Sequence, residues 1–415
     1  MFNIQCSILN FQYALLGSLI FLFAGCKREV DNSLIEANSF IKVFSEASDQ
    51  HFQYIKQCDD GGFIILGIGN DSLFILKINE GGLLQWKKDV PGIDIYDMIA
   101  TELKNGDILV SSIGTVGRYC RIDKNGNILS VAKYWENNNM TRFYSNSYPI
   151  QMQNGQTLIA YSSGAVGGDT GRTYIARFDN NGVQNGLKPI YTTSFLNPGD
   201  ITFKPLYLSL HKCDVEGEYY FNGYAFLNWN GNWRQNWRMF LAKQTYDSAG
   251  KLTSNKTVWV DPVIPDYDNV NYFQLPTDDG VLLVCTRGNK NFINNGVVIK
   301  ADNELKIQWQ TPLNMTPYGT YLTNATLCPD GNYLITGECI VAEKTSNQPF
   351  ACKIDKSGNI IWSKIYPTNF IGSFGLGLEL LDGSLIFGGY TTGFGQGADK
   401  DDIFVIKTDK DGNLK

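Results

Sequence analysis

The sequence predicts an all-β fold built from seven copies of one four-stranded antiparallel unit, and three observations lead to this prediction. A dipeptide that ends in Gly recurs seven times, at spacings of 45 to 63 residues. An apolar or alternating run follows each dipeptide, and a second Gly-containing turn follows most of these runs. The composition agrees, because 42 Gly and 13% aromatic residues are typical of many short strands joined by tight turns.

The first turn of each copy joins two predicted strands, A and B. Asn-Gly and Asp-Gly are the strongest short hairpin signals, because such turns need a positive φ that Gly adopts without steric cost. Six of the seven dipeptides are of this kind, and the fourth is Glu-Gly. The seven anchors are Asp60-Gly61, Asn105-Gly106, Asn154-Gly155, Glu216-Gly217, Asp279-Gly280, Asp330-Gly331 and Asp382-Gly383.

The second turn of each copy joins predicted strands C and D. A polar residue ends strand C, and Gly stands three positions later. The pairs are Asp123/Gly126, Asp179/Gly182, Asp247/Gly250, Asp355/Gly358 and Asp409/Gly412, with Asn79/Gly82 as a variant and Asp302 followed by Leu305 as the exception.

A Trp stands seven positions after the polar turn residue in three copies, at Trp86, Trp309 and Trp362. Two further copies carry Trp135 and Trp259 later in the same strand. Large aromatic side chains that recur at related strand positions are expected to pack between neighbouring sheets. We therefore assign these five tryptophans to the core and not to a binding site.

Four antiparallel strands repeated seven times are the signature of a β-propeller, whose blades bury their faces against one another around an axis. The seventh copy has no fourth run, whereas Phe40–Phe44 near the N-terminus matches Trp362–Tyr366 in pattern. The prediction is a seven-bladed β-propeller of four-stranded antiparallel blades over residues 38–415, its last blade closed by an N-terminal strand. Such closure removes an open sheet edge.

The tandem pattern D-G-G…D-x-x-G-x-x-x-W resembles that of tandem-repeat propeller lipoproteins of Gram-negative bacteria, within the quinoprotein-like and WD40-like propellers. The resemblance covers roughly residues 38–415. It implies the fold and little about activity, because propellers host many unrelated functions. Quinoprotein dehydrogenases usually have a longer Asp-to-Gly spacing and one more blade, so no cofactor is expected in this chain.

An apolar run, Phe11–Phe23, precedes Ala24-Gly25-Cys26 and an abruptly polar segment. The run is shorter than the roughly 20 residues that cross a bilayer, and small residues stand where a signal cleavage site belongs. Cys26 after Ala-Gly resembles a bacterial lipobox. This implies a signal peptide over residues 1–25, an acylated Cys26 and a tether over residues 26–37. A plain secretory signal or an uncleaved anchor is the alternative.

The implied location is the cell envelope, with the lipid in the outer membrane on a periplasmic or surface face that the sequence does not distinguish. The formal net charge is −6, and no run of Lys or Arg occurs. Nucleic acid is therefore not an expected partner, because its binding normally needs a basic face.

Nine cysteines lack a C-x-x-C pair, and several stand at equivalent positions of different copies. Equivalent positions in separate blades are far apart in space. Apart from Cys6 in the signal and Cys26, the cysteines are therefore predicted to be small buried side chains and not a disulfide framework.

Short turns of uniform length join A to B and C to D, which places them all on one side of the propeller. The B-to-C and D-to-A connections vary in length and lie on the opposite side, where binding is expected. The most unusual of them is Tyr224–Arg238, in which Trp, Arg and Asn recur. The predicted ligand- or partner-binding residues are Trp229, Trp233, Arg234, Trp237 and Arg238.

Flat aromatic faces beside guanidinium groups suit stacking on sugar rings or on a partner's aromatic side chains. The alternative is that this loop folds back and buries its tryptophans against the neighbouring blade.

No catalytic or metal-binding residues are predicted. His51 and His211 are the only histidines and fall in different copies, which argues against a histidine–metal cluster or a serine–histidine triad. Acidic residues in predicted loops suit glycosidase chemistry or Ca²⁺ binding, but such groups are usually solvated charge. They are Asp266 and Asp268, and Asp399, Asp401 and Asp402.

Two further motifs are assigned to the fold. The run Asp409–Asn413 resembles the start of a calcium loop, yet its counterpart Asp355–Asn359 makes it an ordinary second turn. The run Gly388–Gly397 is rich in glycine, but no helix is predicted after it, so it is not a phosphate cradle.

These observations predict a membrane-anchored, non-catalytic binding or scaffold module, a monomeric propeller that takes an envelope protein or a glycan on its variable side. The alternative is a propeller enzyme, either a carbohydrate-active hydrolase or lyase or a quinone-dependent oxidoreductase. Clustered carboxylates on the variable side would favour the enzyme, and an exposed aromatic patch there would favour the binder.

Overall fold

The structure is a computed structural model of the chain. It describes residues 39–45, 48–70, 72–91, 96–103, 105–113, 118–133, 142–146, 150–151, 157–164, 172–179, 181–191, 209–212, 218–226, 237–247, 252–260, 268–288, 294–341, 344–366, 371–392 and 400–414. The chain divides into two compact units, Met1–Ile35 and Glu36–Lys415, and every described residue belongs to the second.

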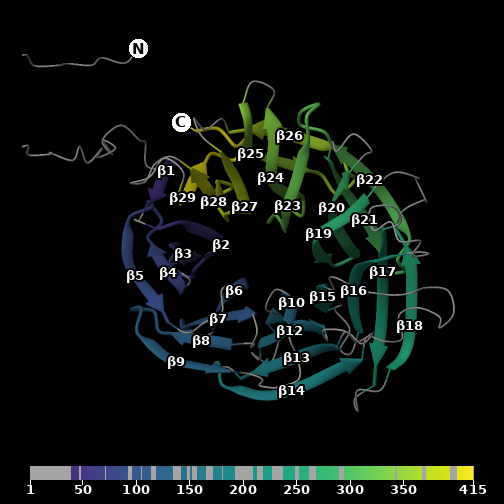
Figure 1. The fold of residues 1–415 in the computed structure, drawn as a ribbon, viewed down its shortest axis with the longest axis horizontal. Helices are drawn as coiled ribbons and strands as arrows, with labels where there is room; N and C mark the ends of the chain where they lie inside the picture. The colour runs from purple at the N-terminus through teal and green to yellow at the C-terminus, as the bar shows by residue number, and fades with distance from the viewer. Residues whose placement is uncertain are drawn as a thin grey trace, which may run out of the picture. The chain divides into compact units, whose positions relative to one another are not determined.

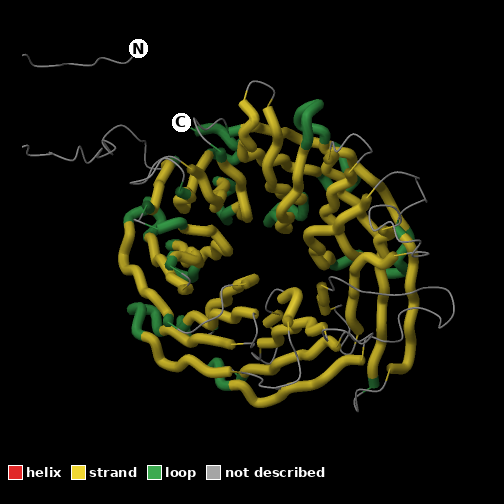
Figure 2. The backbone as a smooth tube through the Cα atoms, viewed as in Figure 1, coloured by secondary structure: helices red, strands yellow, loops and turns green. Residues whose placement is uncertain are grey.

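The described strands of this second unit fall into seven antiparallel sheets, which fits the seven copies counted in the sequence. The sheets stand around a common axis as the blades of a β-propeller (Figure 1), and strands and short loops make up the described backbone (Figure 2). No helix long and apolar enough to cross a bilayer occurs in these residues.

The blades follow one another along the chain. Blade 1 consists of β2 (Gln50–Gln57), β3 (Phe63–Gly69), β4 (Ser72–Ile78) and β5 (Leu84–Val90). Blade 2 consists of β6 (Tyr96–Glu102), β7 (Ile108–Ile113), β8 (Arg118–Ile122) and β9 (Ile128–Lys133). Blade 3 consists of β10 (Arg142–Asn146), β11 (Ile150–Gln151), β12 (Thr157–Gly164), β13 (Arg172–Phe178) and β14 (Gln184–Tyr191). Blade 4 consists of β15 (Ser209–Lys212), β16 (Glu218–Phe226), β17 (Trp237–Tyr246) and β18 (Leu252–Trp259). Blade 5 consists of β19 (Asp268–Thr277), β20 (Gly280–Gly288), β21 (Asn294–Asp302) and β22 (Ile307–Leu313). Blade 6 consists of β23 (Thr320–Leu327), β24 (Tyr333–Val341), β25 (Lys344–Ile354) and β26 (Ile360–Ile365). Blade 7 consists of β27 (Gly372–Glu379), β28 (Leu385–Thr392), β29 (Asp401–Thr408) and β1 (Phe40–Phe44).

Strand order within a blade follows the chain, with the first strand nearest the axis and the fourth on the outside (Figure 1). Blades 3 and 7 depart from this rule, because β10 and β11 both pair with β12, and β1 is the fourth strand of blade 7. The core lies between blades. One cluster joins Ile386, Ile403 and Val405 of blade 7 to the buried residues of blades 1 and 2.

The predicted closure by an N-terminal strand is confirmed. β1 is the fourth strand of blade 7 and pairs with β29 from Phe40↔Lys407 to Phe44↔Ile403. The Phe40 ring also lies against the second turn of blade 1, where a Cβ on Gly82 would approach it to 2.9 Å. One short strand therefore completes blade 7 and fastens it to blade 1.

The predicted turns are confirmed wherever the structure describes them. In the first turns, Gly61, Gly106, Gly280, Gly331 and Gly383 all have a positive φ. Leu305 adopts a φ of 61° at the position that Gly fills in the other second turns, so the sequence exception keeps the same backbone. Asn154-Gly155 and Glu216-Gly217 lie outside the described residues.

The start of the glycine-rich run is explained by packing. Gly388 and Gly389 lie in β28, where a Cβ would stand 2.3 Å from the Phe52 ring and 2.0 Å from the Ser373 carbonyl oxygen, respectively. These glycines allow blade 1 to approach blade 7 and β27 to approach β28. The remaining glycines of the run lie outside the described residues.

Truncating the closing strand tests this architecture. Phe40→Ala removes a side chain that is 6% exposed and is expected to lower the free energy of unfolding by about 3 kcal/mol, as for other buried Phe residues. Ile41→Ala is the matched control, because its side chain is 46% exposed on the same strand. Urea denaturation measures both. Equal, small effects would show that β1 does not close the ring.

Candidate functional site

The turns and loops separate onto two sides of the propeller. The described first and second turns lie on one side, named here the turn side. The described second and fourth strands end, and the described first and third strands begin, on the other side, named here the loop side. The two sides differ in what their polar side chains do.

On the turn side, the recurring Asp caps its own turn. The Asp355 Oδ1 accepts hydrogen bonds from the backbone N–H groups of Ser357 (2.8 Å) and Asn359 (2.8 Å), while the Gly358 N–H donates to the Asp355 carbonyl (3.0 Å). Asp409 repeats this geometry with Asp411 and Asn413. The calcium-like run is therefore the ordinary second turn that its counterpart predicts, with its carboxylate bound to main-chain donors.

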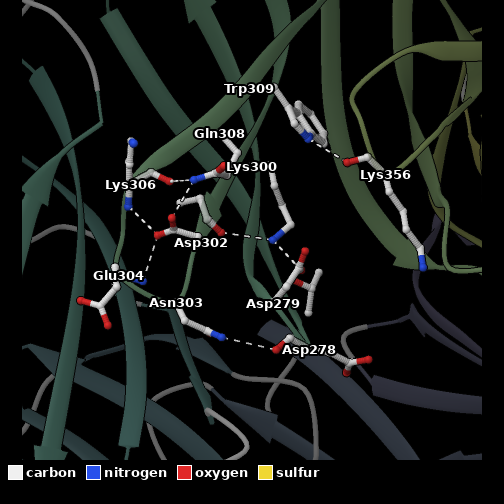
Figure 3. Close-up of polar contacts among 12 residues, drawn as sticks. Asp278, Asp279, Lys300, Asp302, Asn303, Glu304, Lys306, Gln308, Trp309 and Lys356 are labelled. Atoms are coloured by element: carbon white, nitrogen blue, oxygen red, sulfur yellow. Dashed lines mark hydrogen bonds and ion pairs between the residues drawn. The ribbon is translucent and has the colours of Figure 1, made fainter.

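The fourth-strand tryptophans link neighbouring blades. The Trp309 ring lies 2.7 Å from where a Cβ of Gly358 would stand, and its Nε1–H donates to the Lys356 carbonyl at 2.9 Å (Figure 3). Trp86 lies on Gly126 of the next blade in the same way. Trp362 also lies beside the next second turn, at Gly412. The assignment of Trp86, Trp309 and Trp362 to inter-sheet packing is confirmed, whereas the Trp259 ring lies against Phe240 of its own blade and Trp135 lies outside the described residues. The D-x-x-G-x-x-x-W pattern is a device for joining blades.

A basic residue two positions before the turn residue forms a further structural contact. Lys300 pairs with Asp279 at 2.8 Å beside the second turn of blade 5 (Figure 3), and Lys77 pairs with Asp60 at 2.7 Å. Both ammonium groups belong to buried side chains of third strands, and both carboxylates belong to first turns. The pairs therefore tie the two turns of one blade together.

Lys353 extends this contact across two blades. Its Nζ lies 2.7 Å from the Asp330 carboxylate and 2.8 Å from that of Glu379 in blade 7. Cys328, Asp330 and Glu379 place ligand atoms within 4.8 Å of one another, as a metal site would. The ammonium group of Lys353 already supplies the positive charge between both carboxylates. This group is therefore an ion-pair network of the fold, and it gives no support to a metal site.

The cysteine prediction is confirmed for the described residues. Cys58, Cys120, Cys285, Cys328, Cys339 and Cys352 are all buried free thiols. Burial raises the pKa of Cys120 and of Cys352 to about 12 in each case, which keeps both as unreactive thiols at neutral pH. Cys213 lies outside the described residues.

The tryptophan-rich segment is shorter as a loop than predicted. β16 extends to Phe226 and β17 begins at Trp237, and these two residues pair. The hairpin continues because no turn residue interrupts either strand there. Trp237 and Arg238 therefore belong to β17, and the segment left between the strands is 227–236, which lies outside the described residues with Trp229, Trp233 and Arg234.

The loop side brings together polar side chains that the sequence does not group. Glu338, near the loop-side end of β24, accepts a hydrogen bond from Asn347 Nδ2 at 2.7 Å and one from Tyr390 Oη, in β28 of the next blade, at 3.4 Å. Burial raises the pKa of Glu338, although hydrogen bonds from Ser373, Tyr390 and Asn347 act in the opposite direction. The carboxyl thus combines a raised proton affinity with three polar neighbours.

The same group continues into blade 1. His51, at the start of β2, has its Nδ1 3.3 Å from the Asp401 Oδ2, and the Asp401 backbone N–H donates to Asp49 at 3.3 Å. Burial raises the pKa of Asp401, while the nearby imidazole lowers it. Burial, followed by the charges of Glu338 and Asp401, raises the pKa of Tyr390. Tyr390 therefore lies within electrostatic reach of both carboxyl groups.

This loop-side cluster, defined as Glu338, Asn347, Tyr390, Asp401 and His51, draws on three successive blades. It offers carboxyl, amide, phenol and imidazole groups, which suit hydrogen bonding to a hydroxyl-rich or amide-rich ligand. His51 lies at a strand end, with its side chain 55% exposed. Asp401 was predicted to be solvated charge, but it is half-buried and pairs with His51.

The remaining candidates are not brought together with this cluster. Asp402, next to Asp401, is buried, whereas His211 lies in β15 of blade 4. Asp268 begins β19, and Asp266 and Asp399 lie outside the described residues.

No protein-family model matches the sequence, and no curated protein does. Among solved structures, a protein of unknown function from Bacteroides caccae is 13% identical, with a TM-score of 0.40, over 77% of this chain and 94% of that one. The propeller of Dos1 is 12% identical, with a TM-score of 0.44, over 90% of this chain and 96% of that one.

A third similar structure is the periplasmic gluconolactonase of Pseudomonas aeruginosa, which is 14% identical, with a TM-score of 0.47, over 79% of this chain and 95% of that one. These likenesses concern the fold and carry no activity over to this chain. The β-propeller follows from the chain's own sheets and their closure.

The raised pKa of Glu338 gives the cluster a pH signature. Its pKa in the unfolded chain is 4.5 and its folded pKa is higher. The stability that the protonated carboxyl contributes is therefore full below pH 4.5 and is lost as the pH rises through the folded pKa. Relative to Glu338→Gln, the parent should lose unfolding free energy as the pH rises above 4.5, measured by urea denaturation at a series of pH values.

Glu304→Gln is the control for this pH series. Glu304 is exposed on the turn side, and a hydrogen bond from Lys256 lowers its pKa. The parent should show no such loss relative to this variant. A constant difference between the parent and Glu338→Gln across the series would contradict the assignment of a raised pKa.

Proposed function

We propose that this protein is a membrane-anchored, non-catalytic propeller that binds an envelope protein or a glycan on its loop side. One observation carries the proposal. The repeated polar groups of the turn side pair among themselves to build the blades, whereas a mixed polar cluster from three blades gathers on the loop side. Recognition groups are normally placed on connections that a rigid scaffold holds.

The anchor in this proposal is an acylated Cys26. Removal of residues 1–25 leaves Cys26 as the first residue, and the tether over residues 26–37 leads to the propeller over 38–415. A single acyl chain binds membranes weakly, so stable anchoring requires further lipid or a second contact. The protein then resides in the cell envelope, at the outer membrane.

The tryptophan-rich segment forms part of the proposed surface. Trp229, Trp233 and Arg234 stand in the sequence between β16 and β17, and Trp237 and Arg238 begin β17. Aromatic and guanidinium groups suit a ligand with both flat apolar faces and hydroxyl groups, as sugars have. A glycan is therefore the first ligand class to test, followed by envelope proteins.

A propeller enzyme that acts on carbohydrate is the second candidate, because two carboxyl groups with raised pKa lie in the loop-side cluster. Glu338 and Asp401 differ in surroundings, since only Asp401 faces an imidazole. Glycoside hydrolysis needs one protonated and one ionised carboxyl group. Hydrolysis of a bound glycan by the parent, and its loss in Glu338→Gln, would favour this candidate over the binder.

The proposal predicts that Trp229→Ala/Trp233→Ala/Trp237→Ala abolishes retention on a glycan array or capture of a partner from envelope extract. The midpoint of thermal unfolding should not change, because the side chains of a binding surface do not pack into the core. The control, Lys124→Ala/Lys356→Ala, changes exposed turn-side residues and should retain binding. A large loss of stability in the tryptophan variant, or loss of binding in the control, would contradict a binding surface on the loop side.

A further inference from the structure

The chain enters the propeller on the turn side. β1 begins at Phe40, whose partner Lys407 stands just before the second turn of blade 7, and the Phe40 ring lies on the second turn of blade 1. Ser39, the first described residue, is buried at this point. The chain therefore joins the propeller on its turn side, between blades 7 and 1.

Exposed aliphatic side chains recur around this point. They occupy the fourth to sixth positions after the polar residue of the second turn, where the outer strand begins. They are Leu83 and Leu84 in blade 1, Ile128 and Leu129 in blade 2, Val183 in blade 3, Ile360 and Ile361 in blade 6, and Leu414 in blade 7. A further Leu, Leu381, is 92% exposed in the first turn of blade 7.

Single exposed aliphatic residues are common on protein surfaces, whereas a repeated set on one side is not explained by chance exposure alone. Blade 5 provides the contrast. At the equivalent positions, Lys306 and Gln308 are exposed, and Ile307 is half-buried against the core. Among the described residues, blades 1, 2, 3, 6 and 7 carry the aliphatic set, and blade 5 does not.

Charge on this side is mixed. The tips of the second turns carry exposed Lys124 in blade 2, Lys356 in blade 6 and Lys410 in blade 7. Exposed carboxylates stand on the same side, at Glu80, Asp382 and Asp411 in blades 1 and 7 and at Asp278 and Glu304 in blade 5. Aliphatic side chains with lysines among them match the interface of a phospholipid bilayer, where apolar groups enter the acyl boundary and ammonium groups meet phosphates.

We propose that the turn side of blades 6, 7, 1 and 2 rests on a phospholipid bilayer, with Leu381 and the aliphatic pairs at the acyl boundary and the three lysines at the headgroups. The loop side then faces away from the membrane, toward a ligand. The inference rests on the proposed anchor at Cys26. The 12 residues between Cys26 and Ser39 span at most about 40 Å, so they keep the turn side within reach of the anchoring bilayer.

Depth-dependent fluorescence quenching tests this orientation on the lipidated full-length chain in vesicles that contain anionic phospholipid. Single cysteines replace Leu381, Ile128 or Ile361 on the turn side, and each carries an environment-sensitive fluorophore. Nitroxides on the lipid acyl chains should quench most of this fluorescence. The parent, treated identically, measures labelling of native cysteines, and thermal unfolding confirms that each variant folds.

The matched controls are Tyr318→Cys and Ile371→Cys, which replace exposed residues in loop-side connections. They should show no acyl-chain quenching. Equal quenching on both sides, or none at the three turn-side positions, would overturn the orientation. Vesicle flotation and the mass of the N-terminal residue report separately whether the anchor is present. If an envelope protein shields the turn-side fluorophores and the acyl-chain nitroxides do not quench them, the turn side binds a protein partner, and the proposed orientation on the bilayer is overturned. A chain that carries no lipid and does not float would remove the anchor and the orientation together.

Discussion

The structure depends on the contact between an aromatic ring on an outer strand and a turn glycine of the next blade. The contact recurs at Trp86, Trp309 and Trp362, and Phe40 makes it for the blade that the N-terminal strand completes. A side chain at the glycine would collide with the ring, and the polar residue that starts the turn holds the glycine in place through main-chain hydrogen bonds. At these four junctions an outer strand of one blade is thus fastened to the second turn of the next blade.

This constraint separates the two sides of the molecule. The turn side carries related carboxylates, basic residues and rings in several blades, and Lys353 shows that such ion pairs also join neighbouring blades. The loop-side connections differ in length along the sequence, and the polar cluster described there is not repeated among the described residues. The cluster around Glu338 and Tyr390 uses that freedom, because it takes its members from different strands of blades 6, 7 and 1.

Much of the fold is readable from local pattern. The turns, the closing strand and the buried cysteines are set by residues close in sequence or by equivalence between copies, and even Leu305 keeps the backbone that its neighbours predict. The ion pairs of the third strand had a readable signal that was missed, since Lys or Arg stands two positions before several turn residues, as at Lys77, Arg121 and Lys300.

The loop-side cluster had no such signal. Glu338 and Tyr390 are 52 residues apart, and their meeting depends on how two blades are staggered, which no single copy encodes. The bounds of Tyr224–Arg238 were predicted wrongly for a related reason. A hairpin can extend beyond the blade wherever its strands still pair, and the pairing of Phe226 with Trp237 is a property of both strands together.

Amide hydrogen exchange in β29 tests the closed ring most directly. This strand pairs with β28 on one side and with β1 on the other, as β25 pairs with β24 and β26 in blade 6. The closed ring predicts that successive amides of β29 exchange as slowly as those of β25, including the ones that face β1. Fast exchange at every second amide of β29, as in an edge strand, would contradict closure by the N-terminal strand.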